Sequence, residues 1–216
     1  MRVLTESERR RAPPLVARRA SDIGARYAAL HREMVEQVER AAAMESHWLL
    51  YTLLGWEHAL TCAVSYYLVE VARLGEPHRW VYGALWLGQL GVALATIRLV
   101  RGRSAIAEAP LRRIINRVGG IFLLLCGNVA VLNATAGLPV FVFLPVLATL
   151  SSFAFLVLAC LISRRFLLCA LGMFAAGALM ARFPAYGFLI YGGGWLAVLQ
   201  TVAFVLWRRR GRWLTA

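Results

Sequence analysis

The sequence has no lysine, and only 16% of its 216 residues are charged. A soluble domain of this length usually carries about a quarter charged residues, so the deficit argues against a soluble protein. The charge that is present is concentrated in residues 1–45, in residues 98–117 and after Trp207. The stretches between are nearly all apolar and are about as long as a bilayer core is thick. We therefore expect an integral membrane protein.

Catalytic and metal-binding patterns are also absent. The sequence contains no GxSxG, HExxH or Walker loop, which are the patterns of common hydrolases, zinc proteases and nucleotide-binding proteins. The four cysteines form no CxxC pair, so neither a zinc site nor a thioredoxin-like motif is indicated. No secretory signal is predicted, because the first apolar run begins only at Trp48. These absences favour a protein without catalytic activity.

The net charge of +13 comes entirely from arginine, and such an excess can indicate a nucleic-acid partner. Here the arginines lie at the ends of apolar segments and in the links between them, where membrane topology requires them. We therefore expect no nucleic-acid partner. A chain that is rich in alanine, glycine and leucine and uses only arginine is typical of a GC-rich bacterial genome, so we expect a bacterial inner membrane.

The expected fold is all-α, with a bundle of six transmembrane helices over residues 47–207. The predicted spans are Trp48–Val71, Trp80–Val100, Gly119–Ala136, Val140–Ile162, Phe166–Phe183 and Tyr186–Trp207. With the N-terminus inside, the inner segments hold 21 arginines and the outer links hold three. Because positive charge stays on the cytoplasmic side, both ends of the chain are expected in the cytoplasm.

The segments outside the bundle are expected to be cytoplasmic. Residues 1–20 are predicted to be a mobile tail, and residues 208–216 a basic tail. Between residues 21 and 46, apolar side chains recur at helical spacing and predict an amphipathic helix. Its polar face carries both signs of charge, whereas lipid-binding surface helices are usually basic. We expect it to pack on protein.

Polar residues gather on one face of the first predicted span, where they form a seam. The seam consists of His47, Tyr51, Glu57, His58, Thr61 and Ser65. Glu57 and His58 fall near the middle of the span, where a charge costs a few kcal/mol unless it is satisfied. Four interpretations remain open: a path for protons or a small solute, an acid–base pair, ligands for haem or another pigment, and structural hydrogen bonds between helices.

The haem interpretation meets a geometric objection. His47 and His58, the two candidate ligands, are eleven residues apart on one helix face, or about 16 Å along the axis. They cannot both bind one iron atom. No cofactor is assigned.

Small residues recur at four-residue spacing and predict close helix packing, either within the bundle or between subunits. They are Ala84, Gly88, Gly91, Ala95, Gly172, Ala176, Gly177 and Ala181. In addition, residues 72–103 align without gaps to residues 181–212, and both segments contain Tyr-Gly-x-x-Trp-Leu-x-x-Leu. This similarity indicates either a duplication or the limited set of residue types that membrane helices commonly use at their interfaces and packing faces.

From these observations we expect a structural or accessory subunit of a larger membrane assembly. Its partners would be the lipid bilayer and other membrane subunits or further copies of itself. The alternative is a transporter or channel for protons or a small solute that uses the seam. A third possibility is a membrane enzyme that acts on a lipid-like substrate at Glu57 and His58.

Overall fold

The computed structural model describes residues 22–33, 35–36, 47–72, 79–101, 110–136 and 140–214. The chain divides into two units, Met1–Gln37 and Val38–Ala216. The elements in the described ranges are helical, and these ranges contain no strand. The all-α class is therefore confirmed.

The first unit contains a helix over residues 22–33. Ile23, Tyr27 and Leu30 recur on one side of it, and all three are exposed. The ring of Tyr27 stacks on that of His31 at 6.3 Å. The expected tail at residues 1–20, and residues 21, 34 and 37–46 of the expected amphipathic helix, lie outside the described residues.

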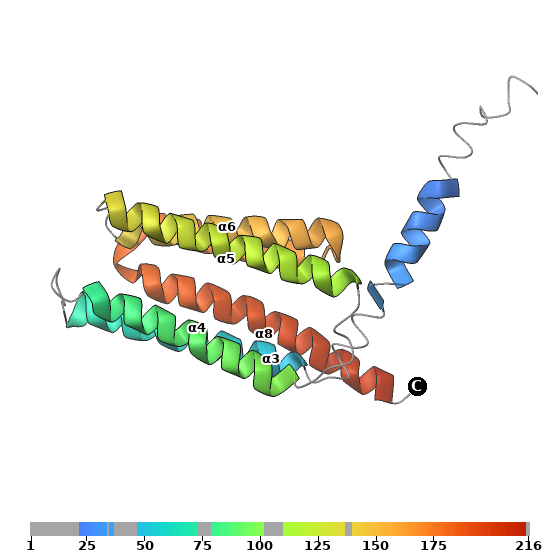
Figure 1. Cartoon of the computed structure of the whole chain (residues 1–216), viewed down its shortest axis with the longest axis horizontal. Coiled ribbons are helices and arrows are strands. Elements are labelled where there is room, and N and C mark those ends of the chain that lie inside the picture. The colour runs from blue at the N-terminus through green and yellow to red at the C-terminus, as the bar shows by residue number, and fades with distance from the viewer. Residues whose placement is uncertain are drawn as a thin grey trace, which may run out of the picture. The chain divides into compact units, whose positions relative to one another are not determined.

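The second unit has a helix at each of the six apolar segments (Figure 1). They are α3 (His47–Tyr66, continued by a π-helical turn at Tyr67–Val71), α4 (Arg79–Arg101), α5 (Pro110–Ala136), α6 (Val140–Leu161), α7 (Phe166–Arg182) and α8 (Gly187–Leu214).

Two of these helices are longer than the apolar segments at which they were predicted. α5 begins at Pro110 rather than near Gly119, and proline is favoured at the first position of a helix because its missing N–H is not needed there. α8 continues to Leu214, through residues expected in the basic tail. Arginines near a helix C-terminus interact favourably with its dipole, which supports this extension.

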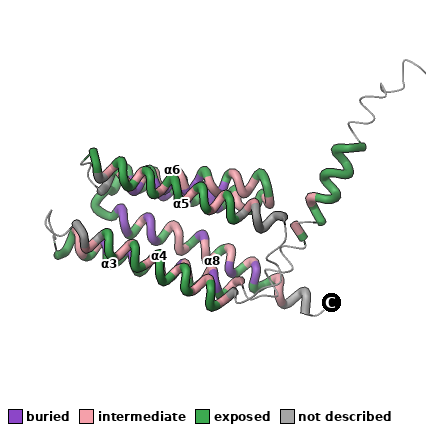
Figure 2. Tube along the Cα trace, in the orientation of Figure 1, coloured by how far each residue is buried: buried purple, intermediate pink, exposed green. Residues whose placement is uncertain are grey.

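α8 is the central helix of the second unit. It packs along α3 on one side and along α7 on the other, with a smaller contact to α6. α4 packs on α3, and α5 packs on α6, so that α3 and α4 lie on one side of α8 and α5 and α6 on the other (Figure 1). Buried residues follow the inner faces, most visibly along α8 (Figure 2). The core includes Cys62, Leu144, Met173 and Tyr191, one from each of α3, α6, α7 and α8.

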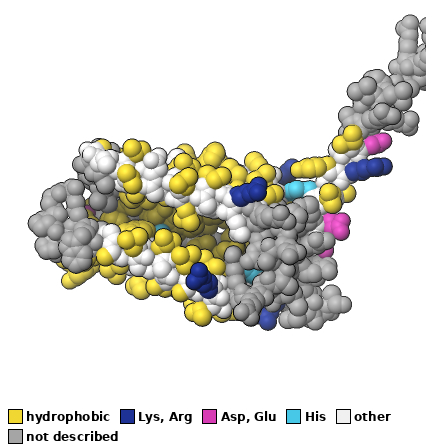
Figure 3. Space-filling view, viewed as in Figure 1, with side chains coloured by type: hydrophobic (Ala, Val, Ile, Leu, Met, Phe, Trp, Pro, Cys, Tyr) yellow, Lys and Arg dark blue, Asp and Glu magenta, His cyan; other side chains and the backbone are white. Residues whose placement is uncertain are grey.

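On the face shown in Figure 3, hydrophobic side chains cover much of the surface of the described helices. Leu87, Leu124 and Leu168 are each at least 70% exposed, and monomeric soluble proteins rarely expose continuous apolar surface on this scale. Among the described residues, four helical segments are long and apolar enough to cross a membrane. They are Gly83–Val100, Asn116–Asn133, Val142–Leu161 and Pro184–Arg210.

α3 and α7 are not among these four segments. Glu57 and His58 lower the mean hydropathy of α3, and α7 has only 17 residues. The composition of the described helices is therefore that of a membrane protein with four candidate spans.

Candidate functional site

The polar seam of α3 lies against the neighbouring helices. His47, Tyr51, Glu57 and His58 are half-buried, whereas Thr61 and Ser65 are buried. The hydroxyl of Thr61 donates to the backbone carbonyl of Glu57 at 3.0 Å. The hydroxyl oxygen of Ser65 is buried and has no hydrogen-bond partner among the described residues. The seam thus places polar groups inside a helical bundle, where each needs a partner.

His58 is the best-connected member of the seam. The side-chain amide nitrogen of Gln89, on α4, donates to Nδ1 of His58 at 2.7 Å. With Nδ1 as the acceptor, the ring carries its proton on Nε2, which lies 3.7 Å from Sγ of Cys62. The imidazole is therefore neutral in this arrangement and links α3 to α4.

Three aromatic rings surround the imidazole. Trp86 of α4 and Trp195 of α8 both meet it edge-on with ring centroids 5.8 Å away, at interplanar angles of 68° and 66°. Tyr191 of α8 meets it at 5.4 Å and 67°. We call these three residues the aromatic box. Edge-to-face contacts at this distance are a favoured geometry for aromatic rings.

The two tryptophans occupy equivalent places in the two similar segments of the sequence. Trp86 lies in residues 72–103 and Trp195 at the matching position of residues 181–212. α4 and α8 both pack on α3, and each supplies its tryptophan to His58 at the same centroid distance. The sequence similarity thus corresponds to a near-symmetric arrangement around one side chain.

Glu57 lies beside this cluster in a different environment. Both carboxylate oxygens are buried, and neither has a partner at hydrogen-bond geometry among the described residues. The backbone of Ala93 on α4 also interacts favourably with the carboxylate. Burying a carboxylate without a partner is energetically expensive, so Glu57 is the seam residue whose environment satisfies it least.

Close contact between α3 and α8 depends on two glycines. A Cβ atom at Gly192 would lie 2.6 Å from Cβ of Cys62, and one at Gly55 would lie 3.3 Å from the side chains of Leu199 and Gln200. The amide of Gln200 donates to the backbone carbonyl of Thr52 at 3.2 Å. Because Gly55 and Gly192 have no Cβ atom, α3 and α8 can approach each other closely. This close approach brings Tyr191 and Trp195 of α8 to His58.

His47 and His58 are not brought together. His47 is the first residue of α3, and His58 lies in the middle of the helix. In the described ranges, no three histidine, cysteine, aspartate or glutamate side chains gather where they could hold a metal ion. Among the described residues that contact His58, Cys62 has a side chain that could also ligate a metal.

The small residues divide into two groups. Ala84, Gly88, Gly91 and Ala95 are all exposed, on the face of α4 about 180° from Ala93. No atom lies within 4 Å of a Cβ built on Gly88 or Gly91. We call these four residues the α4 small face.

The second group lies on α7. Ala176 is buried against Gly194 of α8, and Gly177 packs on Ala148 of α6. Gly172 and Ala181 are exposed. This group thus contributes partly to packing within the chain, unlike the α4 small face.

Sequence reasoning missed the aromatic box. Tryptophans and tyrosines in membrane segments are common and usually mark the interfaces, so Trp86, Trp195 and Tyr191 did not indicate a site. The repeated Tyr-Gly-x-x-Trp-Leu pattern was the available indication that Trp86 and Trp195 share an environment. Comparison of the chain with known protein families, characterised proteins and solved structures found no match.

Proposed function

We propose that this chain crosses a bacterial inner membrane six times, with both ends in the cytoplasm. Four helices have the length and composition of spans. α3 packs between two of them, α4 and α8. Near one end of α3, Gln200 donates a hydrogen bond to the backbone carbonyl of Thr52. In the middle Gln89 donates to His58, and at the other end Tyr66 stacks on Tyr186. A helix held along its length by two spanning helices lies in the same layer as they do. α7 packs in the same way on α6 and α8.

The orientation follows from the arginines. Residues 1–46, residues 98–117, the α6–α7 link and the C-terminal part of α8 hold 21 arginines, and the other three are Arg73, Arg79 and Arg182. The positive-inside rule then places the termini in the cytoplasm. The amphipathic helix is cytoplasmic as well, with Ile23, Tyr27 and Leu30 as its exposed apolar side.

Within that membrane, the chain serves as a structural or accessory subunit of a larger assembly. The observation that carries this proposal is the α4 small face. α4 packs substantially on α3 alone among the described helices, and its small residues lie on the side opposite α3. Small residues let a second helix approach closely, and in a membrane such packing is a main driving force for association.

The test is the mass of the particle extracted in a mild detergent. We expect the unmodified protein to run with partners or further copies, as a particle heavier than one chain. The variant Gly88→Leu/Gly91→Leu should run as a single chain, because two leucine side chains would keep a partner helix away. Light scattering measures both masses.

The matched control is Gly120→Leu/Gly127→Leu on α5. Both of these glycines are exposed, and neither has an atom within 4 Å of a built Cβ. The control should leave the heavier particle intact. A folded, functional monomer from the unmodified chain, or equal loss in both double variants, would refute the proposal.

A second candidate function is a path for protons or a small solute along the seam. It is favoured by one observation, the buried carboxylate of Glu57 without a hydrogen-bond partner in the described part of the chain. Intramembrane carboxylates of this kind are characteristic of proton relays and ion pathways. His58, the next residue, can also change protonation.

This candidate is tested by flux into liposomes that contain the purified protein. Glu57→Gln and His58→Ala should each abolish proton or solute flux, whereas Glu70→Gln, at the exposed end of α3, should not. Normal flux through both seam variants would mean that the seam is structural.

A further inference from the structure

α4 and α5 leave a groove between them. α4 packs on α3 and α5 packs on α6, and α4 and α5 make little or no contact with each other. The space-filling view shows the molecule hollowed between these two helices, with hydrophobic side chains on the inner surface (Figure 3). We call this hollow the α4–α5 groove.

Trp195 of α8 lies between the two walls of the groove. Its ring contacts His58 on the α4 side at 5.8 Å, Phe122 of α5 at 6.1 Å and Phe155 of α6 at 5.5 Å. Trp86 lies on the α4 side of the same cluster. The groove is thus lined by aromatic and aliphatic groups, and its occupant must be apolar along most of its length.

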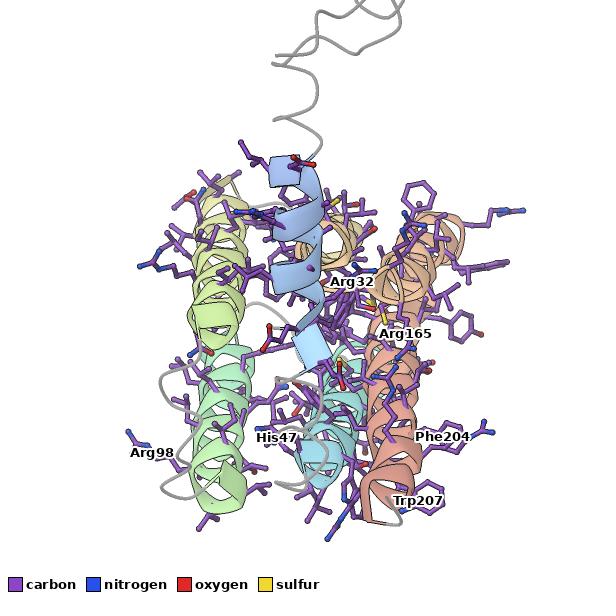
Figure 4. The ribbon with its side chains drawn as sticks, turned by 90° about the vertical axis from the view of Figure 1, so that its right-hand side faces the viewer. Arg32, His47, Arg98, Arg165, Phe204 and Trp207 are labelled. Atoms are coloured by element: carbon purple, nitrogen blue, oxygen red, sulfur yellow. The ribbon has the colours of Figure 1, made fainter. Side chains whose placement is uncertain are left out.

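One end of the groove is basic. Arg98 lies near the end of α4 and Arg117 near the start of α5, and these two helix ends lie at the same end of the second unit (Figure 1). Both arginines are exposed, and the side chain of Arg98 projects away from the bundle (Figure 4). In the described part of the second unit the carboxylates are Glu57 and Glu70, and neither forms a salt bridge with these arginines.

We propose that the α4–α5 groove binds an anionic phospholipid, with its phosphate between Arg98 and Arg117 and an acyl chain along the apolar walls. Guanidinium groups bind phosphate oxygens with paired, charge-assisted hydrogen bonds. From Arg98 to Trp86 the helix rises about 18 Å, which is close to the half-thickness of about 15 Å that one leaflet of acyl chains spans. The lipid tail would therefore end near the aromatic box.

The proposal rests on the membrane location of the bundle and not on the nature of its partner. Its test uses the full chain in detergent micelles, titrated with phosphatidylglycerol or phosphatidylcholine whose acyl chains carry bromine near the methyl end. Bromine quenches tryptophan fluorescence on contact. Comparison with the Trp195→Phe variant isolates the contribution of Trp195.

We expect brominated phosphatidylglycerol to quench Trp195 at about tenfold lower mole fraction than brominated phosphatidylcholine, because two arginines near the surface each favour an anionic lipid. Arg98→Gln/Arg117→Gln should remove this preference. The control variant Arg164→Gln/Arg208→Gln removes the same amount of charge from two other exposed positions. It should retain the preference for phosphatidylglycerol.

Three results would overturn the proposal. Equal quenching by the two lipids would mean that the head group is not recognised. Equal loss of preference in both double variants would mean that only overall charge attracts the lipid. Failure of either lipid to quench Trp195 would mean that a protein helix, or nothing from the bilayer, fills the groove.

Discussion

His58 joins three helices through a single side chain. It belongs to α3, accepts a hydrogen bond from Gln89 of α4, and contacts Tyr191 and Trp195 of α8. In an apolar surrounding, one hydrogen bond to a buried nitrogen decides whether that nitrogen is satisfied or carries the full cost of desolvation. The position of α4 therefore depends strongly on Gln89.

Replacing Gln89 with leucine should destabilise the bundle, because Nδ1 of His58 would remain buried without a donor. We expect the free energy of unfolding to fall by about 1–2 kcal/mol, measured by denaturant titration in micelles. Asn128→Leu makes the same kind of change at an exposed position of α5. This control should alter the free energy of unfolding by less than about 0.5 kcal/mol. Equal effects of the two substitutions would show that the Gln89 bond contributes nothing.

At the scale of elements, the contact between α3 and α8 is more extensive than any other between the described helices. It is also the contact in which glycine is most needed, since the backbone of α8 at Gly192 lies directly against Cys62 and Ala59. Cores tolerate added methyl groups poorly when the obstructing atoms belong to a neighbouring backbone or to a short side chain.

Gly192→Ala should therefore push α3 and α8 apart. We expect a loss of about 1–3 kcal/mol in the free energy of unfolding, together with a change in tryptophan fluorescence as Trp195 moves away from His58. Gly193→Ala is the control one residue away, where a Cβ meets no atom within 4 Å. Because alanine is the better helix former, that variant should be unchanged or more stable by up to about 1 kcal/mol. A tolerated Gly192→Ala would contradict the close packing.

The sequence was sufficient to locate the six helices, because long apolar runs must bury or shield their backbone groups as helices. It was less informative about their ends. Arg112, Arg113 and Arg117 suggested a link, yet they lie within α5, since arginine is a good helix former and does not end a helix.

The candidate site was only partly predictable for a different reason. Helical periodicity is a property of one segment, so it could place Glu57 and His58 on the seam of α3. Which side chains face the seam depends on how helices distant in sequence pack together. Trp86 and Trp195 were therefore visible only as a repeated pattern, and their common contact with His58 emerged from the fold.

At the scale of the whole molecule, the charge distribution and the apolar surface support one arrangement. Exposed leucines cover the outer faces of the helices, and arginines collect in residues 1–46, in residues 98–117, in the α6–α7 link and in the C-terminal part of α8. Phe204 and Trp207 project together from the C-terminal part of α8, with ring centroids 6.1 Å apart (Figure 4). Aromatic residues concentrate where a span meets the head groups, so we expect this pair at the interface that the proposed topology places on the cytoplasmic side.

The most direct measurement is the accessibility of epitope tags fused to Met1 and Ala216 in intact and in permeabilised spheroplasts, in which the outer side of the inner membrane is exposed. An even number of spans with the arginine-rich segments inside predicts that antibodies reach both tags only after permeabilisation. If one tag is reached in intact spheroplasts and the other is not, the number of spans is odd, and the membrane placement of α3 and its seam is wrong.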